Sequence, residues 1–453
     1  MPVHSPPGRD IMACRVFRSV ILAISIPFLC SAENFSQDIF PIVRARCQTC
    51  HQEGEIGPMA FTNYSDTRPW AKAIRDAVIS RSMPPWHASE RSKLTFHNDR
   101  SLPQAEVQKI VKWVDAGAPE GPKIDYPKPV KTETGWKLGK PDVVLSVPGY
   151  KVPARGDIPY TFVIRSVGLT KDRWIRAAEF RIDKRAVVHH MNAFIRPPGS
   201  SYLDGFERDR FAVPTLTERR VGRPGEGMFE RRELLLGYEP GYFPIPWRSE
   251  QAKLIRAGSD IVFEIHYTAN GKEQTDSSEF GIYFSDEPPR ERVLSTQTQD
   301  MDIAIPAGDA NYKSNASITF GKPVKLISLQ PHMHLRGKAM EIRARYPDGR
   351  VETLLDVPRY SFNWQTTYFL KEPKLLPAGS SIESTAVFDN SPNNPFNPDP
   401  KTTIKWGDQS WEEMHIGFME IAFAADMNAE TVIDAAAKER EKKRFERSAE
   451  TTR

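Results

Sequence analysis

The chain has 453 residues, which predicts two or three domains with ample apolar material for their cores. Its 62 lysines and arginines nearly balance its 58 aspartates and glutamates, so the charge gives no reason to expect nucleic acid or an anionic membrane as a partner. The 38 prolines and many short β-branched runs favour a sheet-rich protein with long turns.

Residues 1–32 have the pattern of a signal peptide for export. Arginines precede an apolar run from Val20 to Leu29, and small residues follow before Glu33. The run of about ten residues is too short for a bilayer, which needs roughly twenty, and no later segment comes close. We therefore expect a periplasmic or secreted protein without a membrane span. The alternatives are a lipid anchor at Cys30, which the preceding leucine disfavours, and a start at Met12.

Cys47-Gln48-Thr49-Cys50-His51 has the spacing of a c-type haem attachment motif. Export would remove Cys14 and Cys30, so no cysteine would remain for a structural disulfide. The histidine after the pair indicates two covalent links to one haem c, with His51 as the proximal ligand of its iron.

Residues 33–120 are predicted to form a small all-α cytochrome c domain around this haem. Apolar residues recur near helical spacing in the segments Asp38–Cys47, Arg68–Arg81 and Pro103–Ala116. The second segment places four large apolar residues near one face: Trp70, Ile74, Val78 and Ile79.

The distal haem ligand is expected to be Met83. It lies in Ser82-Met83-Pro84-Pro85 just after the second helix, where the prolines would hold the thioether in place. Met59 is the alternative because it is close to the haem motif in sequence, and either methionine could instead be an ordinary core residue.

Gly121–Lys140 is rich in proline and lysine without an apolar period, which predicts an exposed linker. From Pro141 onward, apolar residues alternate in short runs between turns, which indicates antiparallel β-sandwiches. The runs are Val143–Val147, Tyr160–Ile164, Val262–Tyr267 and Ile318–Ile327. We expect two all-β sandwiches, over residues 141–295 and 296–434, followed by a charged tail over 435–453 without an assigned function.

His332 and His334 are separated by one residue, so on a strand both side chains project from the same face and can chelate one ion. Met414 lies in a strand-like run, Trp411–Phe418, in which His415 would point away from it, so His415 is left out of the site. Imidazole and thioether ligands favour copper that cycles through Cu(I). The alternative is a polar strand face for the two histidines and a core position for Met414.

His189 and His190 are adjacent and would face opposite sides of a regular strand. Binding one metal with both therefore requires a β-bulge or a strand end. His266 is the natural third ligand, and it would complete a site of histidines alone that keeps open coordination positions.

The order of these motifs resembles the type II copper, ascorbate-dependent monooxygenases, the family of peptidylglycine α-hydroxylating monooxygenase and dopamine β-monooxygenase. Four spaced motifs within residues 141–426 carry the resemblance: His-His-Met from His189, His-Tyr from His266, His-x-His from His332, and Glu-Met ending at Met414.

The resemblance implies two jelly-roll sandwiches, each with one copper, and a solvent-filled cleft between them. By this resemblance, the first copper is held by His189, His190 and His266, and the second by His332, His334 and Met414. Dioxygen would be activated at the second copper for hydroxylation of a substrate C–H bond, and the first copper would deliver an electron.

Two departures from the family bear on the substrate. Gln330 and Phe418 stand where the peptide-hydroxylating member has an arginine and a tyrosine that grip the substrate carboxylate. A glycine-extended peptide is therefore not expected, and Phe418 with Ile416 favours a less polar small molecule. The family's disulfides are absent as well.

The expected cofactors are one haem c and two copper ions. We expect the haem to replace or supplement ascorbate as the electron source, with a periplasmic electron donor behind it.

Two other functions would use some of the same haem-binding and metal-binding residues. A periplasmic haem and copper protein for electron transfer or copper binding would need no open site for dioxygen. A structural or carbohydrate-binding sandwich fused to a cytochrome would bind no stoichiometric copper. A His-x-His pair with a distant Glu-Met has little purpose in a binding module, which favours the monooxygenase.

Overall fold

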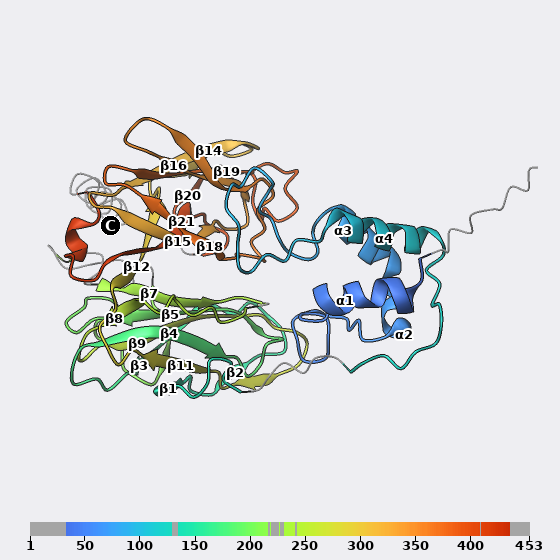
Figure 1. The fold of residues 1–453 in the computed structure, drawn as a ribbon, viewed down its shortest axis with the longest axis horizontal. Coiled ribbons are helices and arrows are strands. Elements are labelled where there is room, and N and C mark those ends of the chain that lie inside the picture. Colours follow the sequence, from blue (N-terminus) through green and yellow to red (C-terminus); the bar gives the residue numbers. More distant parts are fainter. Residues whose placement is uncertain are drawn as a thin grey trace, which may run out of the picture.

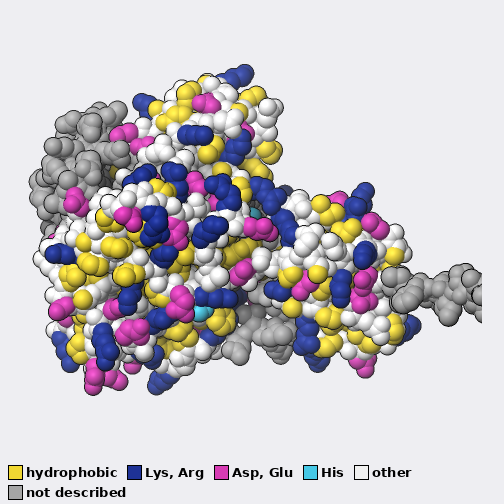
Figure 2. Space-filling model, turned by 45° about the horizontal axis from the view of Figure 1, so that its top comes forward, with side chains coloured by type: hydrophobic (Ala, Val, Ile, Leu, Met, Phe, Trp, Pro, Cys, Tyr) yellow, Lys and Arg dark blue, Asp and Glu magenta, His cyan; other side chains and the backbone are white. Residues whose placement is uncertain are grey.

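The computed structural model describes residues 33–128, 135–215, 218, 226, 231–240, 242–407 and 409–434. The predicted signal peptide, the charged tail and residues 129–134 of the predicted linker lie outside these ranges. In the described part of the chain, no helix is long and apolar enough to cross a membrane. Basic and acidic side chains are interspersed over the face in Figure 2, as the even charge balance predicts.

The N-terminal part of the chain is helical, and its helices lie together at one end of the molecule, beside the sheets (Figure 1). They are η1 (Phe35–Ile39), α1 (Phe40–Arg46), α2 (Tyr64–Thr67), η2 (Arg68–Trp70), α3 (Ala71–Ile79) and α4 (Gln104–Asp115). Helices are therefore present in the three predicted segments. The short α2 was not predicted, and it begins where the Asn63 side chain accepts a hydrogen bond from the backbone N–H of Asp66.

These short helices are held by one apolar core. Phe35, Ile110 and Trp113 are each at most 1% exposed within it. Full burial of such side chains contributes roughly 1.5–3 kcal/mol each, which short helices need because they are marginal alone. Trp70 and Ile79, which the sequence places near helical spacing, lie at the ends of η2 and α3 and are 41% and 50% exposed.

The first strand-rich part consists of two packed sheets. Its main strands are β1 (Val143–Ser146), β3 (Thr161–Ser166), β4 (Arg173–Arg181), β5 (Val188–Arg196), β6 (Phe211–Ala212), β7 (Glu233–Tyr238), β8 (Gln251–Ile255), β9 (Asp260–Tyr267) and β11 (Glu279–Phe284). A separate pair is formed by β2 (Tyr150–Val152) and β10 (Gln274–Asp276). The sheet β6-β3-β9-β5-β7 shares a core with β1, β11 and β4, where the rings of Phe263 and Phe280 lie 5.5 Å apart.

The second strand-rich part repeats this arrangement. Its main strands are β12 (Glu291–Gln299), β14 (Tyr312–Thr319), β15 (Val324–His332), β16 (Gly337–Arg345), β17 (Val351–Val357), β18 (Tyr368–Leu376), β19 (Ser381–Phe388) and β21 (Ile416–Ala424). Smaller elements are β13 (Ala304–Ile305), β20 (Ile404–Lys405) and η3 (Ala429–Thr431). The sheet β14-β19-β16-β17 packs on β12, β21, β15 and β18 through a core that includes Ile342 and Ile421. The fold is therefore mostly β-sheet, arranged as two sandwiches, as predicted at this level.

One eight-stranded sheet runs through both sandwiches, in the order β1-β11-β4-β8-β12-β21-β15-β18. The junction is the parallel pairing of β8 with β12, in which Gln251 lies opposite Glu291. The predicted boundary between residues 295 and 296 falls inside β12, which pairs with β21 along its whole length.

A buried lysine ties the strands together at this junction. Lys253 of β8 has a side chain that is 0% exposed, and its Nζ lies 3.0 Å from a carboxylate oxygen of Glu420 on β21. The same ammonium donates to Ser295 Oγ of β12 at 2.6 Å and to the carbonyl of Leu234 in β7 at 2.7 Å. The two sandwiches are thus joined by charge-assisted contacts as well as by the sheet.

The run Ile318–Ile327, predicted as one strand, spans the end of β14 and the start of β15. The turn between them is held by Gly321, whose N–H donates to the carbonyl of Val432 at 2.8 Å. The fully buried Phe320 continues the apolar alternation into the turn, which is why the pattern reads as one strand.

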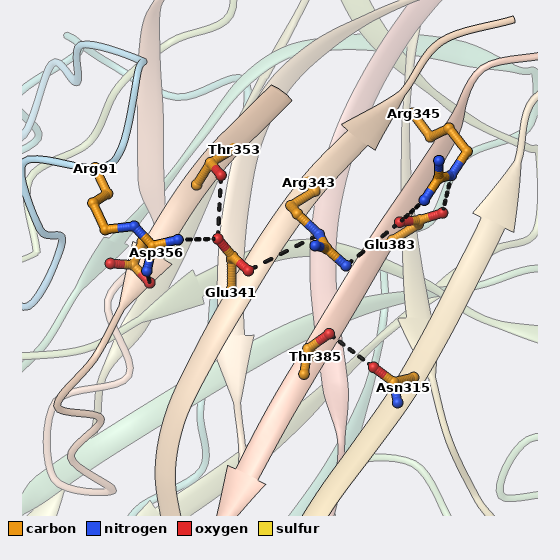
Figure 3. Close-up of polar contacts among 9 residues, drawn as sticks. All are labelled: Arg91, Asn315, Glu341, Arg343, Arg345, Thr353, Asp356, Glu383 and Thr385. Atoms are coloured by element: carbon orange, nitrogen blue, oxygen red, sulfur yellow. Dashed lines mark hydrogen bonds and ion pairs between the residues drawn. The ribbon is translucent and has the colours of Figure 1, made fainter. Parts of the chain in front are cut away.

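The chain between α3 and α4 packs on the second sandwich. The rings of Trp86 and Phe96 lie 4.9 and 5.3 Å from that of Tyr368 in β18. Arg91 forms an ion pair of 2.8 Å with Glu341 of β16 (Figure 3). The helical part is therefore anchored to the second sandwich by this segment.

The predicted linker is exposed over residues 121–125, but its ends are fixed. Tyr126 packs on Phe40 of α1 with ring centroids 4.9 Å apart. The backbone N–H of Lys137 donates to the Glu179 carboxylate of β4 at 2.8 Å. The connection is thus attached to the parts on both sides of it.

Candidate metal centre and haem-attachment site

A bulge in β5 brings two adjacent histidines to one place. The register of β5 and β9 shifts between Val188 and His190, so that His190 lies opposite His266 and His189 is the extra residue. A β-bulge or strand end was predicted to be necessary if His189 and His190 share one metal ion, and the bulge is confirmed. One ring nitrogen from each of the three histidines lies within 4.8 Å of the others, and Nδ1 of His189 is 3.2 Å from Nδ1 of His190.

The environment of these three imidazoles keeps them neutral. Burial lowers the pKa of His189, lowers that of His190 well below its usual value, and lowers that of His266 to about 4. Neutral imidazole is the form that binds a metal ion. Nδ1 of His266 is buried without a hydrogen-bond partner in the described structure, a cost of about 1–3 kcal/mol that a metal ion would remove.

An aromatic ring covers one side of this histidine group. Tyr160, directly before β3, stacks on His266 with ring centroids 4.6 Å apart and an interplanar angle of 16°. Its ring lies 5.4 Å from that of His190. Tyr160 therefore packs on two of the three imidazoles, stacked on His266 and tilted against His190.

The second histidine pair lies at the end of β15. His332 is the last residue of the strand and His334 follows it, so only His332 is on the strand as predicted. Their ring centroids are 5.3 Å apart. Nδ1 of His332 donates to Oε1 of Gln365 at 2.5 Å, and Nδ1 of His334 donates to the carbonyl of Glu412 at 3.2 Å. In these tautomers the lone pair of each ring is on Nε2.

Met414 lies at the same end of the second sandwich. β15 and β21 pair with His332 opposite Ile416. His334 and Met414 both lie two residues beyond this pair, at the same end of the two strands. The backbone N–H of His334 also donates to the Glu413 carboxylate at 2.8 Å, which ties the two segments together.

Glu413 and Arg336 form a buried network behind this end of the site. Glu413 is 0% exposed and Arg336 is 1% exposed. The Arg336 guanidinium donates to Asn390 Oδ1 at 2.8 Å and to the carbonyl of Trp411 at 2.7 Å. Burial raises the pKa of Glu413 to about 8, although it accepts backbone hydrogen bonds from Arg336, His334 and Met414. The network fixes the loop that carries Met414.

The predicted strand over Trp411–Phe418 begins only at Ile416. His415, just before it, is buried and directed into the core. Its Nδ1 lies 2.7 Å from the hydroxyl of Ser314 and its Nε2 lies 2.8 Å from that of Ser384. Both ring nitrogens are used by hydroxyls, in agreement with leaving His415 out of the site.

One aromatic ring lies beside both histidine groups. The ring of Phe362 lies 6.4 Å from that of His189 and 5.9 Å from that of His334. Charges on His332 and His334 also help to lower the pKa of His190, after burial and the nearer histidines. The candidate sites on the two sandwiches are therefore near each other, with Phe362 beside both.

Apolar side chains border the second group. Phe418 has its ring 5.8 Å from that of His332, and Gln330 lies opposite Phe418 in the pairing of β15 and β21. The side-chain amide of Gln330 donates to the backbone carbonyl of Gln365 at 2.8 Å. Neither position supplies a charge for a substrate carboxylate.

The haem motif lies directly after α1, and neither Cys47 nor Cys50 is in a disulfide. Nδ1 of His51 lies 3.1 Å from the carbonyl of Met59, which accepts its proton. Ligand histidines commonly donate their second ring nitrogen in this way, which leaves Nε2 for a metal. The His51 ring stacks on Phe61 with centroids 4.5 Å apart.

The chain after the motif approaches the His51 ring closely. A Cβ atom at Gly57 would lie 2.6 Å from Nδ1 of His51 and 2.6 Å from the carbonyl oxygen of Cys50. Only glycine permits this approach, so Gly57 fixes the path of the loop around the imidazole.

The two candidate distal ligands lie in different surroundings. Met59 packs on the helical core together with Cys47. Met83 is partly buried after α3, and its N–H donates to the carbonyl of Ala77 at 3.3 Å. Nearby, Arg359 of the second sandwich donates to the carbonyl of Ser80 at 2.5 Å.

Several residues that shape the site have roles that were not predicted from the sequence. Gln365 and Phe362 lie in a loop, Tyr160 precedes a strand, and the role of Glu413 depends on a contact with a distant segment. Glu413 is the glutamate of the Glu-Met motif, but its contact with His334 leaves no local signal in the sequence. The other three residues belong to no spaced motif, so no local signal could have identified them.

Comparisons with known proteins do not assign a family. No family model matches the chain, and no curated protein matches it. An allantoicase structure shares 11% identity over 53% of this chain and 80% of that chain, with a TM-score of 0.16. The VP2 subviral particle of infectious bursal disease virus shares 9% identity over 66% of this chain and 76% of that chain, with a TM-score of 0.17. Structural similarities with TM-scores this low support no conclusion about fold or function.

Proposed function

We propose that the chain is an exported dicopper monooxygenase that hydroxylates a C–H bond of a small organic substrate, using dioxygen and electrons supplied through an N-terminal c-type haem. The observation that carries this proposal is the pair of histidine groups that both lie beside the ring of Phe362. On this proposal the two sandwiches are jelly rolls and the helical part is a cytochrome c domain.

The first copper would be held by His189, His190 and His266. The short distance between Nδ1 of His189 and Nδ1 of His190, and the unpartnered Nδ1 of His266, fit an ion bound through these nitrogens. Three neutral imidazoles form a donor set that suits copper in both oxidation states. Tyr160 packs against two of the rings, those of His190 and His266, and would limit their rotation.

The second copper would be held by Nε2 of His332, Nε2 of His334 and the thioether of Met414. Copper bound there would supply the activation of dioxygen for C–H hydroxylation. Gln365 and the carbonyl of Glu412 fix the tautomers of the two histidines. The methionine thioether is a soft ligand and favours the reduced ion.

The substrate is proposed to be a small and largely apolar molecule. Phe418 and Phe362 border the imidazoles of His332 and His334. Gln330 stands where an arginine would bind a substrate carboxylate, and it has no charge. Its side-chain amide donates a hydrogen bond to the Gln365 backbone. These side chains exclude water and would position an apolar C–H bond near the second group.

The haem would be attached through Cys47 and Cys50, with Nε2 of His51 as proximal ligand. Bound haem would supply one electron at a time. The Met59 carbonyl accepts from Nδ1, on the side of the imidazole away from Nε2. The backbone of Met59 therefore lies at the Nδ1 edge of His51, and Met83 is retained as the proposed distal ligand.

We infer export from the signal-peptide pattern of residues 1–32. The haem-attachment motif fits export, because in this proposal the haem is attached outside the cytoplasm. The electrons would then come from a periplasmic donor.

Oxygen uptake by the purified full-length protein tests the proposal. The protein is loaded with haem and copper, reduced with ascorbate, and supplied with a panel of small apolar compounds under ¹⁸O₂. Incorporation of ¹⁸O into a product supports the proposal. Stoichiometric copper without oxygen uptake would instead indicate an electron-transfer or copper-binding protein, and absence of bound copper would indicate a binding sandwich.

A further inference from the structure

The loop that follows the haem motif contacts the first sandwich. A carboxylate oxygen of Glu55 lies 3.8 Å from Nε of Arg185, and the two side chains are only 10% and 18% exposed. Arg185 lies just before β5, four residues before His189. The contact therefore joins the haem motif to the strand that carries two of the three histidines.

A buried tyrosine continues from this contact toward the histidine group. Tyr238 ends β7, is 3% exposed, and pairs with Met191 of β5. Met191 directly follows His190. Tyr238 also lies within electrostatic reach of Arg185, Glu55 and the Cys50 thiol. The start of β5 and the end of β7 thus lie beside the haem-motif loop and carry two residues of the first metal group.

The second sandwich touches the helical part elsewhere. Arg359 bonds to the carbonyl of Ser80, at the end of α3, and Arg91 pairs with Glu341 of β16. These contacts involve segments that follow α3, not the loop after the haem motif.

We propose that electrons reach the sandwiches at the His189, His190 and His266 group, across the contact between the haem-motif loop and the β5–β7 strand pair, and that the Glu55–Arg185 ion pair is the positioning contact. The inference rests on the proposed function. The family resemblance already implies that the first copper delivers an electron, and the inference adds the route by which an electron reaches that site. The step transfers one electron from ferrous haem iron to cupric copper, which leaves ferric iron and cuprous copper. No covalent bond is formed or broken.

Electron transfer within the full-length holoprotein tests the route. The haem is reduced by a flash-generated flavin semiquinone without oxygen, its reoxidation is followed by absorbance, and the loss of the Cu(II) signal is followed by freeze-quench EPR. The two changes should match in amount. Arg185→Glu should slow haem reoxidation about tenfold or more, which corresponds to about 1.4 kcal/mol in the barrier.

A charge-reversed double variant and a matched control distinguish a positioning role of the Glu55–Arg185 pair from general damage to the folded protein. Arg185→Glu combined with Glu55→Arg should recover most of the rate, because it restores an ion pair at the same place. Arg345→Glu, which breaks a surface pair with Glu383 on the outer sheet (Figure 3), should leave the rate unchanged. If Arg185→Glu does not fold, Glu55→Gln on the loop provides the same test, and an unchanged rate in either variant overturns the route.

The acceptor site is tested by removing one group at a time. His266→Ala should slow haem reoxidation, whereas His332→Ala should retain it with one electron accepted. The opposite pattern would overturn the inference. Oxygen uptake with excess ascorbate, which can reduce the copper ions directly, reports on the oxygenase separately. Normal oxygen uptake together with an unchanged rate of haem reoxidation in Arg185→Glu rejects only the route. Absence of oxygen uptake in every variant rejects the proposed function.

Discussion

Nδ1 of His189 and Nδ1 of His190 lie 3.2 Å apart although the two residues are neighbours on a strand. In a regular strand their side chains would point to opposite faces. The bulge at the start of β5 removes this alternation and directs both rings toward His266 of β9. The first candidate metal site therefore depends on one extra residue in the strand pairing.

Met414→Ile should abolish substrate hydroxylation, because the second group loses its thioether ligand. The haem spectrum and the copper held by His189, His190 and His266 should remain. Oxygen uptake, optical absorbance and EPR measure the three properties. Met419→Ile, a core change on β21, is the matched control and should keep activity at a cost below about 1.5 kcal/mol in stability. Full activity in Met414→Ile would show that Met414 is an ordinary structural residue.

Gln365→Leu should weaken copper binding at the second group by about 10–100-fold, since residues that orient a ligand histidine commonly have effects of this size. Gln365 accepts the Nδ1 proton of His332, and leucine cannot. Gln365→Glu keeps an acceptor and should have a smaller effect. Titration against a copper chelator measures both, and equal affinity in the leucine variant would mean that the hydrogen bond does not orient a ligand.

Lys253→Met should lower the free energy of unfolding by about 3–5 kcal/mol, because it leaves buried carboxylates without a cation. Lys253 is fully buried beside Glu233 and Glu420. Lys325→Met removes a more exposed cation from Glu291 and should cost less than about 1 kcal/mol. Denaturant unfolding compares them, and similar small losses would contradict a role for Lys253 in joining the sandwiches.

Burial raises the pKa of Glu239 to about 7, against weaker opposing effects of Arg100 and the Thr367 N–H. The folded chain therefore binds more protons here than the unfolded chain between pH 4.5 and about 7. Since the native state holds the extra proton, this contribution to stability is fully present below that range and is lost as the pH rises through it.

Glu239→Gln should remove this contribution. The difference in unfolding free energy between the wild type and the variant should change by up to a few kcal/mol, at about 1.4 kcal/mol per pKa unit, and level off above pH 7. Denaturant unfolding at several pH values measures the difference, and a constant difference would mean that Glu239 titrates normally.

The structural features that depend on a local sequence pattern could be predicted. Helical periodicity located α4, and the adjacent pair His189-His190 required the bulge that β5 contains. The continuity of the sheet from β8 to β12 was not predictable, because pairing between distant strands leaves no local pattern. Gln365 and Phe362 were missed for the same reason, since a loop brings them to the histidines only in the folded chain.

Copper content measured on the full-length protein tests the central claim most directly. The account predicts two copper ions per chain in the wild type, one in His266→Ala, one in His332→Ala and none in the double variant, with the haem content unchanged throughout. A wild-type protein that binds no stoichiometric copper, or single variants that keep both ions, would contradict the assignment of the two histidine groups as metal sites.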